Sequence, residues 1–592
     1  MKKVFSVLGL FLFFLTIKAQ INTNSQITPM ELKEHIEVLA SDSLLGRKPG
    51  FDGDIKAAMY IKKQLDALQI KPLFSNGLQN FEIVTSLSAG DNEFSFLDIK
   101  AELDKDFRPV SFSSNGEVTY ETVFVGYGFN INEDSLKWND YSGINVTGKT
   151  VIILRGAPAY DSINKFGNYS SLIKKAYTAK DKGAAAIIFV NGQLFDKDDN
   201  LVPLSYEQGQ NSIGIPVVNI SRKTADELLK PMDITVNIIE QNLNDSKNAN
   251  SFEINTPVYI KTEVLKNKTS TQNVVYLLKG NDPVLSDEYV VLGAHYDHLG
   301  FGGKNSGSRV PDTSAIHYGA DDNASGTSAI IEIIEKLAAN KDNLKRSIIF
   351  TAFSAEEMGL LGSKYFVNNP PVDLKKIKFM VNLDMVGRLN EQTKGLSLGG
   401  TGTAVGLTEL LTELTKSTEL NIKFSPEGYG PSDHASFYSK DIPVLFFFTG
   451  IHDDYHTPRD VAGKINFEGE KKVCDLAYNI ILAISQKQKS MVFAESGPKE
   501  QPETKRNFKV TLGIMPDVSS GDVKGLRADA VIEGRPAFKA GMHKGDIIIA
   551  MDGKPVNDIY EYMNRLQEFK VGQRITVEVL RGTEKVLLIV EL

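Results

Sequence analysis

The sequence predicts an α/β protein whose main domain is built on a mixed, mostly parallel, twisted sheet flanked by helices. Three short apolar segments have the length and composition of buried strands: residues 347–353, 379–383 and 444–448. Segments with helical spacing of apolar residues alternate with these strands: residues 328–339, 407–417 and 471–485. Because parallel strands need long crossover connections, this alternation favours a sheet with helices on both faces.

The chain is too long for a single hydrophobic core. At roughly 100–200 residues per domain, its 592 residues predict three or four domains. We assign residues 20–111 and 241–488 to the main domain, and residues 112–240, which contain short β-rich runs, to a domain inserted in it. The polar stretch 489–505 has the composition of a linker. Residues 506–592 are numerous enough to form a domain of their own.

Composition and charge narrow the classes to which the protein can belong. Hydrophobic residues make up 42% and charged residues 24%, which is ordinary for a folded globular protein and argues against disorder. The 66 Lys and Arg residues are outnumbered by 74 Asp and Glu residues, for a net charge of -8. Non-specific nucleic-acid binding depends on basic surfaces, so we expect no nucleic-acid partner.

Residues 1–19 have the pattern of an export signal. Two lysines precede an apolar run from Val4 to Ile17, and Ala19 is a small residue at a plausible cleavage point, although Ile17 is bulky for its position. The run is too short to span a membrane comfortably, so we expect no stable membrane anchor after cleavage. The single cysteine, Cys474, permits no intrachain disulfide. We therefore expect an exported bacterial protein, either periplasmic or secreted.

The stretch from Val290 to Gly326 contains the first candidate functional residues. An apolar strand leads into His295, and in extended backbone His295 and Asp297 point to the same side. A metal-bound histidine often donates its second ring N–H to such a carboxylate, but a structural His–Asp pair also explains this motif. Asp321 and Asp322 stand where a loop meets the following helix, and helix capping is the alternative explanation for them.

Similar residues follow the other expected strands. Glu356 and Glu357 come directly after one apolar strand, and Asp384 follows the next. Two further motifs lie in the loops on either side of the strand 444–448: Ser432-Asp-His434 and Asp454-Tyr-His-Thr-Pro-Arg-Asp460. Open α/β sheets keep their sites at the carboxyl ends of the strands, so these side chains should meet. A set of only histidines and carboxylates suits zinc or another divalent ion.

Together these motifs resemble the di-zinc exopeptidases of the bacterial leucyl aminopeptidase type. Relatives of that family are glutamate carboxypeptidase II, glutaminyl cyclase and the transferrin receptor ectodomain. The resemblance covers about residues 28–486, apart from the insert, and five separate motifs occur in the family's order. It implies the zinc exopeptidase fold and two Zn²⁺ ions as cofactors. His295 and Asp384 would bind one ion, Glu357 and His456 would bind the other, and Asp322 would bridge them.

The resemblance also implies catalytic roles. Glu356 would be the general base for a metal-activated water, and Tyr455 would donate a hydrogen bond to the developing oxyanion. Asp297 would be the hydrogen-bond partner of the first zinc-binding histidine. His298 is left as a loop or pocket residue, and Asn323 stands where relatives often carry Asp. The family usually has a cis peptide bond directly after the bridging aspartate.

These residues imply a zinc-dependent aminopeptidase that hydrolyses the N-terminal peptide bond of peptide substrates. Two other enzymes on the same scaffold remain alternatives, namely a carboxypeptidase and a glutaminyl cyclase. A non-catalytic, receptor-like binding protein is a third alternative. The intact set of expected ligands argues against that third possibility.

The two flanking regions resemble known accessory domains. Residues 112–240 resemble a protease-associated (PA) domain, which implies a lid or a substrate-guiding surface. Residues 506–592 resemble a PDZ domain of the bacterial protease type, above all in the stretch 534–547. Backbone N–H groups of its loop would hold a peptide C-terminus, and the expected loop residues are Leu512, Gly513 and Ile514. A structural β-domain without a ligand is the alternative.

Overall fold

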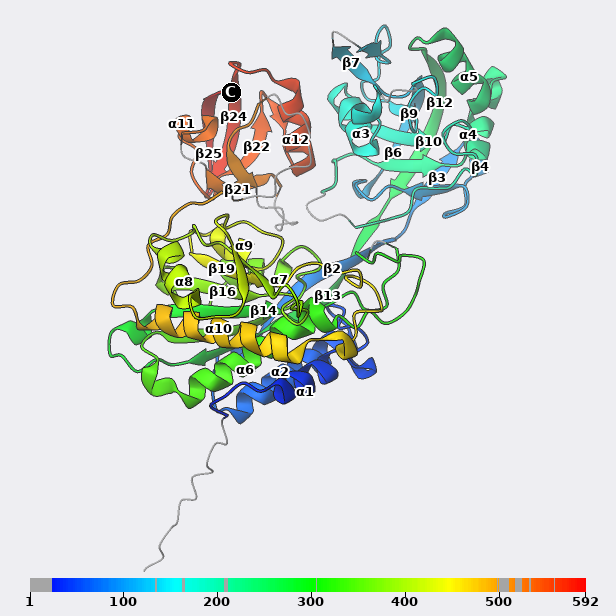
Figure 1. The fold of residues 1–592 in the computed structure, drawn as a ribbon. Helices are drawn as coiled ribbons and strands as arrows, with labels where there is room; N and C mark the ends of the chain where they lie inside the picture. Colours follow the sequence, from blue (N-terminus) through cyan, green and yellow to red (C-terminus); the bar gives the residue numbers. More distant parts are fainter. Residues whose placement is uncertain are drawn as a thin grey trace, which may run out of the picture. The chain divides into compact units, whose positions relative to one another are not determined.

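The computed structural model of the chain is drawn in Figure 1. It describes residues 24–133, 136–161, 165–206, 211–304, 306–497, 499, 510–516, 524–531, 534–557 and 559–592. The expected export signal at residues 1–19 lies outside the described residues. The described residues form two units, the first from residues 24–81 and 271–497 and the second from residues 82–270 and those after 498.

One mixed, nine-stranded sheet is the framework of the first unit. Its strand order is β1-β13-β15-β14-β16-β19-β17-β18, and β2 also pairs with β13. Four central strands run parallel to one another: β14 (Tyr289–His295), β15 (Ser347–Phe353), β16 (Ile377–Leu383) and β19 (Val444–Phe448). Their outer neighbours β13 and β17 are antiparallel to them. The flanking strands are β1 (Lys71–Pro72), β2 (Leu78–Ala89), β13 (Val264–Leu278), β17 (Gly395–Gly399) and β18 (Asn421–Ser425). The predicted mixed and mostly parallel sheet is thus confirmed.

Helices cover both faces of this sheet. One face packs against α1 (Pro29–Leu39), α2 (Asp52–Ala67), α6 (Gly326–Ala339), α8 (Leu407–Thr415) and α10 (Phe467–Gln486). The other face packs against α7 (Leu361–Asn368) and α9 (His434–Tyr438). Strand alternation explains the two cores, since Val290 and Leu292 join the first and Val291 joins the second. The Thr28 side chain caps α1 by accepting the backbone N–H of Glu31 at 3.3 Å.

The inserted domain is built on an eight-stranded sheet. Its strands, in spatial order, are β4 (Ile99–Lys100), β3 (Glu93–Phe96), β12 (Ser251–Thr262), β6 (Gly116–Val125), β9 (Thr150–Leu154), β10 (Ala186–Val190), β11 (Val217–Ile220) and β5 (Phe107–Pro109). Three helices accompany it: α3 (Leu172–Asp181), α4 (Arg222–Leu229) and α5 (Val236–Ser246). The sheet therefore includes strands that lie before residue 112 and after residue 240, because β12 pairs with both β3 and β6.

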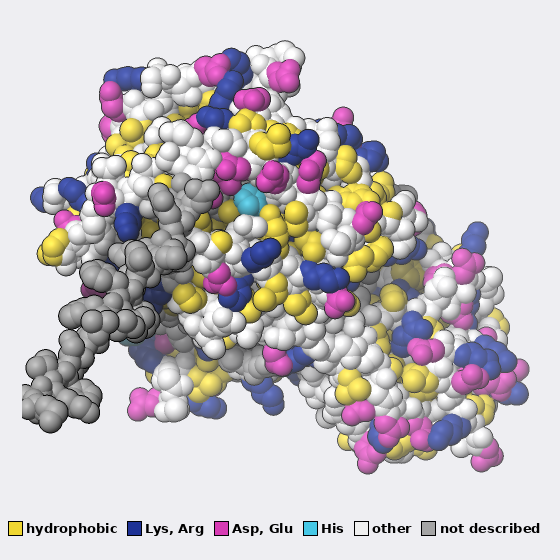
Figure 2. Space-filling view, turned by 90° about the horizontal axis from the view of Figure 1, so that it is seen from below, with side chains coloured by type: hydrophobic (Ala, Val, Ile, Leu, Met, Phe, Trp, Pro, Cys, Tyr) yellow, Lys and Arg dark blue, Asp and Glu magenta, His cyan; other side chains and the backbone are white. Residues whose placement is uncertain are grey.

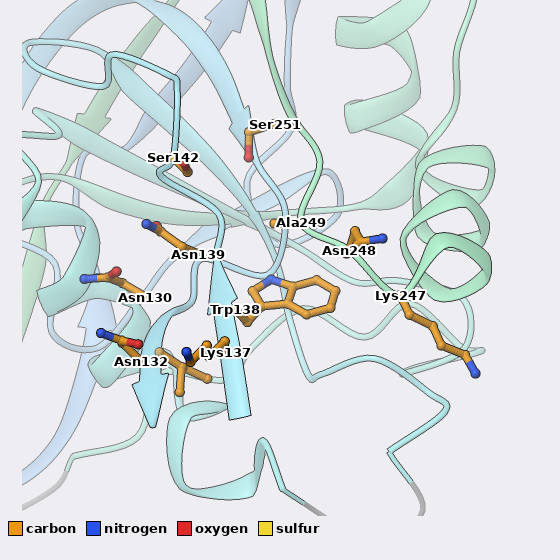
Figure 3. Close-up of a pocket in the computed structure, with 11 residues that line it drawn as sticks. Asn130, Asn132, Lys137, Trp138, Asn139, Ser142, Lys247, Asn248, Ala249 and Ser251 are labelled. Atoms are coloured by element: carbon orange, nitrogen blue, oxygen red, sulfur yellow. The ribbon is translucent and has the colours of Figure 1, made fainter. Parts of the chain in front are cut away.

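Trp138, the only tryptophan, is a core residue of this domain. Its ring meets Phe166 edge-on at 5.5 Å, and its indole N–H donates to Asp140 at 2.9 Å. It also borders a hollow of about 630 Å³ beside the hairpin of β7 (Asn130–Glu133) and β8 (Leu136–Asn139), shown in Figure 3. None of the residues lining this hollow is a histidine or a carboxylate, so it offers no ligands of the kind expected in the main domain.

Asp140 makes the stability of the inserted domain depend on pH. Burial raises the pKa of this carboxyl to about 7, although the N–H groups of Phe129 and Trp138 donate to it. The folded-state pKa lies above the unfolded value, so the stabilising contribution is complete below pH 4 and is lost as the pH rises through 7. We expect the Tm of Asp140→Asn, relative to wild type, to increase between pH 4 and 8 in thermal unfolding scans. A constant difference across this range would contradict the assignment.

The C-terminal domain has a six-stranded sheet. Its strands are β20 (Ile514–Pro516), β21 (Leu526–Val531), β22 (Ile547–Met551), β24 (Arg574–Arg581) and β25 (Glu584–Glu591), with β23 (Lys554–Pro555) paired to β22. Its helices are α11 (Pro536–Lys539) and α12 (Ile559–Glu568). In the expected loop, Leu512 and Ile514 are buried in the domain core. Gly513 has a φ of 73°, and a Cβ there would lie 2.2 Å from Cβ of Arg535, so the loop requires glycine.

Charged side chains of both signs share the surface. On the face drawn in Figure 2, Lys and Arg side chains are interspersed with Asp and Glu, in keeping with a net charge of only -8. None of the helices in the described ranges has both the length and the apolar composition that a membrane crossing requires.

Candidate metal centre

The parallel strands bring the candidate residues to one edge of the sheet. His295 is the last residue of β14, and Glu356 and Glu357 follow the end of β15. Asp384 comes directly after β16, and the loop after β19 carries His456. Because β14 pairs in parallel with β15 and β16, and β16 with β19, their carboxyl ends share one edge.

Two groups of side chains meet at this edge. In the first, Nε2 of His295 lies 3.5 Å from oxygens of both Asp322 and Asp384. In the second, Nε2 of His456 lies 3.1 Å from the other oxygen of Asp322 and 3.2 Å from Glu357. The structure thus brings all five expected zinc ligands together, with one oxygen of Asp322 turned toward each group.

These separations suit a shared cation. Two ligand atoms about 2.1 Å from a tetrahedral zinc ion are roughly 3.4 Å apart. Oδ1 of Asp384, Oδ2 of Asp322 and Nε2 of His456 are buried, and within the described ranges none makes a well-oriented hydrogen bond. Buried polar atoms without partners are rare in folded proteins. The donor set therefore fits a pair of divalent ions.

Asp460 fixes the backbone around Asp322 by accepting hydrogen bonds from it. Oδ2 of Asp460 accepts the N–H groups of both Asp321 and Asp322, at 2.9 and 3.1 Å. The Asp322–Asn323 peptide bond is cis, and Asn323 then donates to the carbonyl of Leu383 at 3.0 Å. Asp321 points elsewhere: it accepts the N–H of Gly387 at 2.7 Å and lies 3.2 Å from His452. Only the second of the two adjacent aspartates therefore faces the cluster.

Asp297 makes different contacts from those expected. Its carboxylate lies 3.6 Å from Nδ1 of His295, which is too long for a hydrogen bond. It instead accepts the backbone N–H groups of Glu356 at 3.0 Å and Glu357 at 3.3 Å. Asp297 thus ties the loop after β15 to the end of β14.

His298, which sequence reasoning left as a loop or pocket residue, is buried inside the cluster. Its Nδ1 lies 2.8 Å from Oε1 of Glu357, and its ring meets that of His456 edge-on at 5.7 Å. His298, Asp322 and Glu357 together could also hold an ion, as could His295, Glu356 and Asp384. The only sequence signal was its three-residue spacing from His295. We refer to His295, His298, Asp322, Glu356, Glu357, Asp384 and His456 as the histidine–carboxylate cluster.

Tyr455 lies over the second group. Its ring stacks on His456 with centroids 3.8 Å apart, and the guanidinium carbon of Arg309 lies 4.9 Å from the Tyr455 centroid. Burial, reinforced by Asp322 and Glu357, raises the pKa of the Tyr455 hydroxyl far above its usual value. The phenol therefore stays protonated at neutral pH and can donate a hydrogen bond.

Burial and neighbouring charges shift the pKa values of the ionisable side chains in this site. Burial raises the pKa of Glu356 well above its usual range, and Glu357 and Asp433 add to this shift. Burial opposes protonation of His456, but the nearby carboxylates of Asp322 and Glu357 outweigh it and raise its pKa to about 10. Cations at this site would therefore displace protons from the ligands.

The Ser432-Asp-His434 motif lies beside the cluster rather than in it. Asp433 is buried, and burial raises its pKa to about 7. His434 stacks on Phe446 with centroids 4.3 Å apart, and burial lowers its pKa to about 3. His434 is therefore a neutral packing residue.

Three parts of the chain match known protein families. Residues 273–481 match peptidase family M28, residues 116–228 match the PA domain, and residues 510–592 match the PDZ domain. The part of the chain that carries the histidine–carboxylate cluster is thus a peptidase family M28 domain, and it is accompanied by a PA domain and a PDZ domain. This confirms the family resemblance on which the site was predicted.

Among similar proteins are bacterial aminopeptidases. Aminopeptidase YwaD of Bacillus subtilis (strain 168) is 27% identical over 352 residues, which are 58% of this chain and 64% of that protein. An aminopeptidase of Pseudomonas aeruginosa (strain UCBPP-PA14) is 23% identical over 488 residues, 78% of this chain and 77% of that protein. The chain spans less than two thirds of the length of the first of these relatives.

Solved structures that match include a zinc aminopeptidase from Bacillus subtilis. It is 23% identical and has a TM-score of 0.45, and the match covers 80% of this chain and 100% of that chain. The glutaminyl cyclase of Porphyromonas gingivalis is 21% identical with a TM-score of 0.31, covering 36% of this chain and 78% of that chain.

Proposed function

We propose that this chain is a zinc-dependent aminopeptidase that removes single residues from the N-termini of peptides and uses two zinc ions. The observation that carries this proposal is the pair of histidine–carboxylate groups that share Asp322. The match to peptidase family M28 and the aminopeptidases among the relatives support the same activity.

Five residues of the cluster would hold the ions. We assign His295 and Asp384 to one ion, Glu357 and His456 to the other, and Asp322 to both. When bound, such ions act as Lewis acids that acidify a water molecule and polarise a carbonyl group. In this scheme His298 orients Glu357 through the contact at 2.8 Å, as residues behind a metal ligand commonly do.

Glu356 and Tyr455 would perform the proton and charge chemistry. Glu356 lies 3.9 Å from His295, and its main chain is anchored by Asp297. Because burial raises the pKa of its carboxyl group, Glu356 can take a proton from the attacking water and release it to the leaving amine. The protonated hydroxyl of Tyr455 donates to the carbonyl oxygen as negative charge develops there.

A peptide digest separates this activity from its alternatives. We expect the zinc-loaded protein to shorten a free peptide and its C-terminal amide by one residue at the N-terminus, and to leave the N-acetylated peptide intact, as read by mass spectrometry. Chelation should abolish cleavage, and zinc or cobalt should restore it, because the water is activated only with ions bound. Shortening at the C-terminus would indicate a carboxypeptidase, and cyclisation of an N-terminal glutamine would indicate a cyclase.

We further propose that the PDZ domain docks the C-terminal ends of long peptides. Its loop at Leu512, Gly513 and Ile514 contains a glycine with a positive φ, its backbone N–H groups would hold the carboxylate, and strand addition would hold the peptide. Deleting the residues after Ser496 should raise KM for long peptides and spare small chromogenic substrates. Equal losses for both substrates would contradict a docking role.

We also propose that the protein is exported to the periplasm or the medium of a bacterial cell. The support is the charged and apolar pattern of residues 1–19. The mass of the mature protein would test this, since cleavage after Ala19 leaves Gln20 as its first residue.

A further inference from the structure

Arg47 is fully buried in the loop between α1 and α2, and among the described residues its guanidinium donates to four backbone carbonyls. Nε donates to Tyr296 at 2.6 Å, and Nη2 donates to Gly319 at 2.8 Å. Nη1 donates to both Tyr318 at 2.7 Å and Leu39 at 2.5 Å. One planar group therefore spans three segments that are far apart in the sequence.

Two of these segments carry the histidine–carboxylate cluster. Tyr296 lies between His295 and Asp297, and Gly319 stands three residues before Asp322. The side chain of Arg47 thus joins the segment that holds one expected ligand to the segment that holds the bridging ligand. Within the described ranges, no hydrogen bond joins His295 directly to the segment 318–322, so their relative position depends on such indirect supports.

The backbone of the same loop adds two further contacts. The N–H of His298 donates to the carbonyl of Arg47 at 3.1 Å, and the N–H of Gly300 donates to the carbonyl of Gly46 at 2.9 Å. Gly46 has a φ of 69°, and a Cβ there would lie 2.5 Å from the carbonyl oxygen of Gly300 and 2.6 Å from that of His317. The loop therefore packs so closely against the segment 296–300 that there is no room for a side chain at Gly46.

The positive charge of Arg47 also offsets the electrostatic repulsion among the carboxylates near the site. Burial lowers its pKa to about 10, while Asp322, Asp297, Asp460 and Glu357 favour the charged form. At neutral pH the side chain therefore remains a cation. A lysine would preserve that charge, but its single ammonium could not reach carbonyls on three separate segments.

We propose that Arg47 is a positioning residue of the metal centre, which holds the segments 295–298 and 318–322 at their ligating separation before any cation binds. The inference rests on the proposed assignment of His295 and Asp322 as ligands. Ligands that are already in place lose less entropy when the ion binds. Residues behind metal ligands typically contribute about 10–100-fold in metal affinity or activity.

The test compares Arg47→Lys with Arg346→Lys in the full-length protein. Arg346 is the control, because it too is buried and donates to carbonyls, those of Ile484, Ser485 and Lys487, although its Nε donates to the carboxylate of Glu288 at 2.8 Å. It precedes the start of β15, whereas Glu356 follows the end of that strand. Zinc affinity is measured by chelator competition and ligand geometry by the absorption spectrum of bound Co²⁺.

We expect Arg47→Lys to bind zinc about 10–100-fold more weakly and to alter the Co²⁺ spectrum. Arg346→Lys should lower Tm but keep the wild-type affinity and spectrum. Unchanged affinity in Arg47→Lys, or an equal loss in Arg346→Lys, would overturn the proposal. Wild-type protein that binds the ions without cleaving peptides would refute only the aminopeptidase activity, whereas failure to bind either ion would refute the metal centre and this inference together.

Hydrogen exchange of the wild-type protein tests the inference even if Arg47→Lys does not fold. The amides of His298 and Gly300 donate to the Arg47 loop, so we expect them to stay protected after the ions are removed. If removal of the ions makes these amides exchange as fast as those of an unstructured peptide, the metal and not Arg47 orders the segment. That result would overturn the proposal.

Discussion

Glu356→Gln is expected to retain both zinc ions and lose nearly all peptide hydrolysis. The substitution keeps the shape of the side chain but removes the group that takes the proton from water, and general bases typically contribute about 10²–10⁴-fold to the rate. The main-chain bond from residue 356 to Asp297 does not depend on the side chain, so the loop should stay in place. Steady-state kinetics and the metal content of the same sample are the two measurements.

The adjacent glutamate provides the matched control for Glu356. Glu357 lies 3.2 Å from His456 and 2.8 Å from His298, so Glu357→Gln should lose metal and activity together. A Glu356→Gln protein with wild-type turnover would remove Glu356 from its role as base. Loss of metal from Glu356→Gln would instead place Glu356 among the ligands, in keeping with its position near His295 and Asp384.

Asp322→Ala is expected to lose both ions and, with them, detectable activity. One carboxylate oxygen lies in each group of the cluster, at 3.5 Å from His295 and 3.1 Å from His456, so a single truncation removes a ligand from both positions. Once the ions are lost, the remaining carboxylates repel one another without the cations that would compensate them. Metal content after dialysis and peptide turnover measure the effect.

Asp321→Asn is the control for the bridging residue. Asp321 is equally buried, but it accepts the N–H of Gly387 and contacts His452 instead of the cluster. We expect Asp321→Asn to keep both ions even if its Tm falls. If Asp322→Ala retains one ion, Asp322 is a ligand at a single position. If Asp321→Asn loses both ions, the effect belongs to the η6 turn (Ala320–Ser325) as a whole.

The strands could be predicted from the sequence because burial on both faces leaves a local signal. The segments 347–353 and 444–448 were expected as strands and are strands with the same ends. A strand covered by helices on both sides must be apolar throughout, and the first charged residue after it marks the sheet edge. That is why Glu356 and Asp384 could be recognised as candidates before any contact was known.

Contacts made by the backbone left no such signal. Asp297 was expected to be the hydrogen-bond partner of His295; it lies 3.6 Å from that ring, and its hydrogen bonds come from the amides of Glu356 and Glu357. Every residue except proline has the same backbone amide group, so the residue type does not predict which amides make these contacts. The contacts of Arg47 are of the same kind, and only the folded chain brings its partners within reach.

By itself the sequence determined the central apolar strands and several helices of the main domain, the presence of the two accessory domains, and the residue types available at the sheet edge. The family resemblance had already favoured Asp322 as the bridge, but the tertiary structure alone decided that His298 supports Glu357 and that Arg47 joins two ligand segments. The physical reason is the separation, along the sequence, of the residues that each feature depends on. Apolar periodicity is imposed on neighbouring residues along one strand or helix, whereas a metal site depends on distances between segments that only the packed sheet establishes.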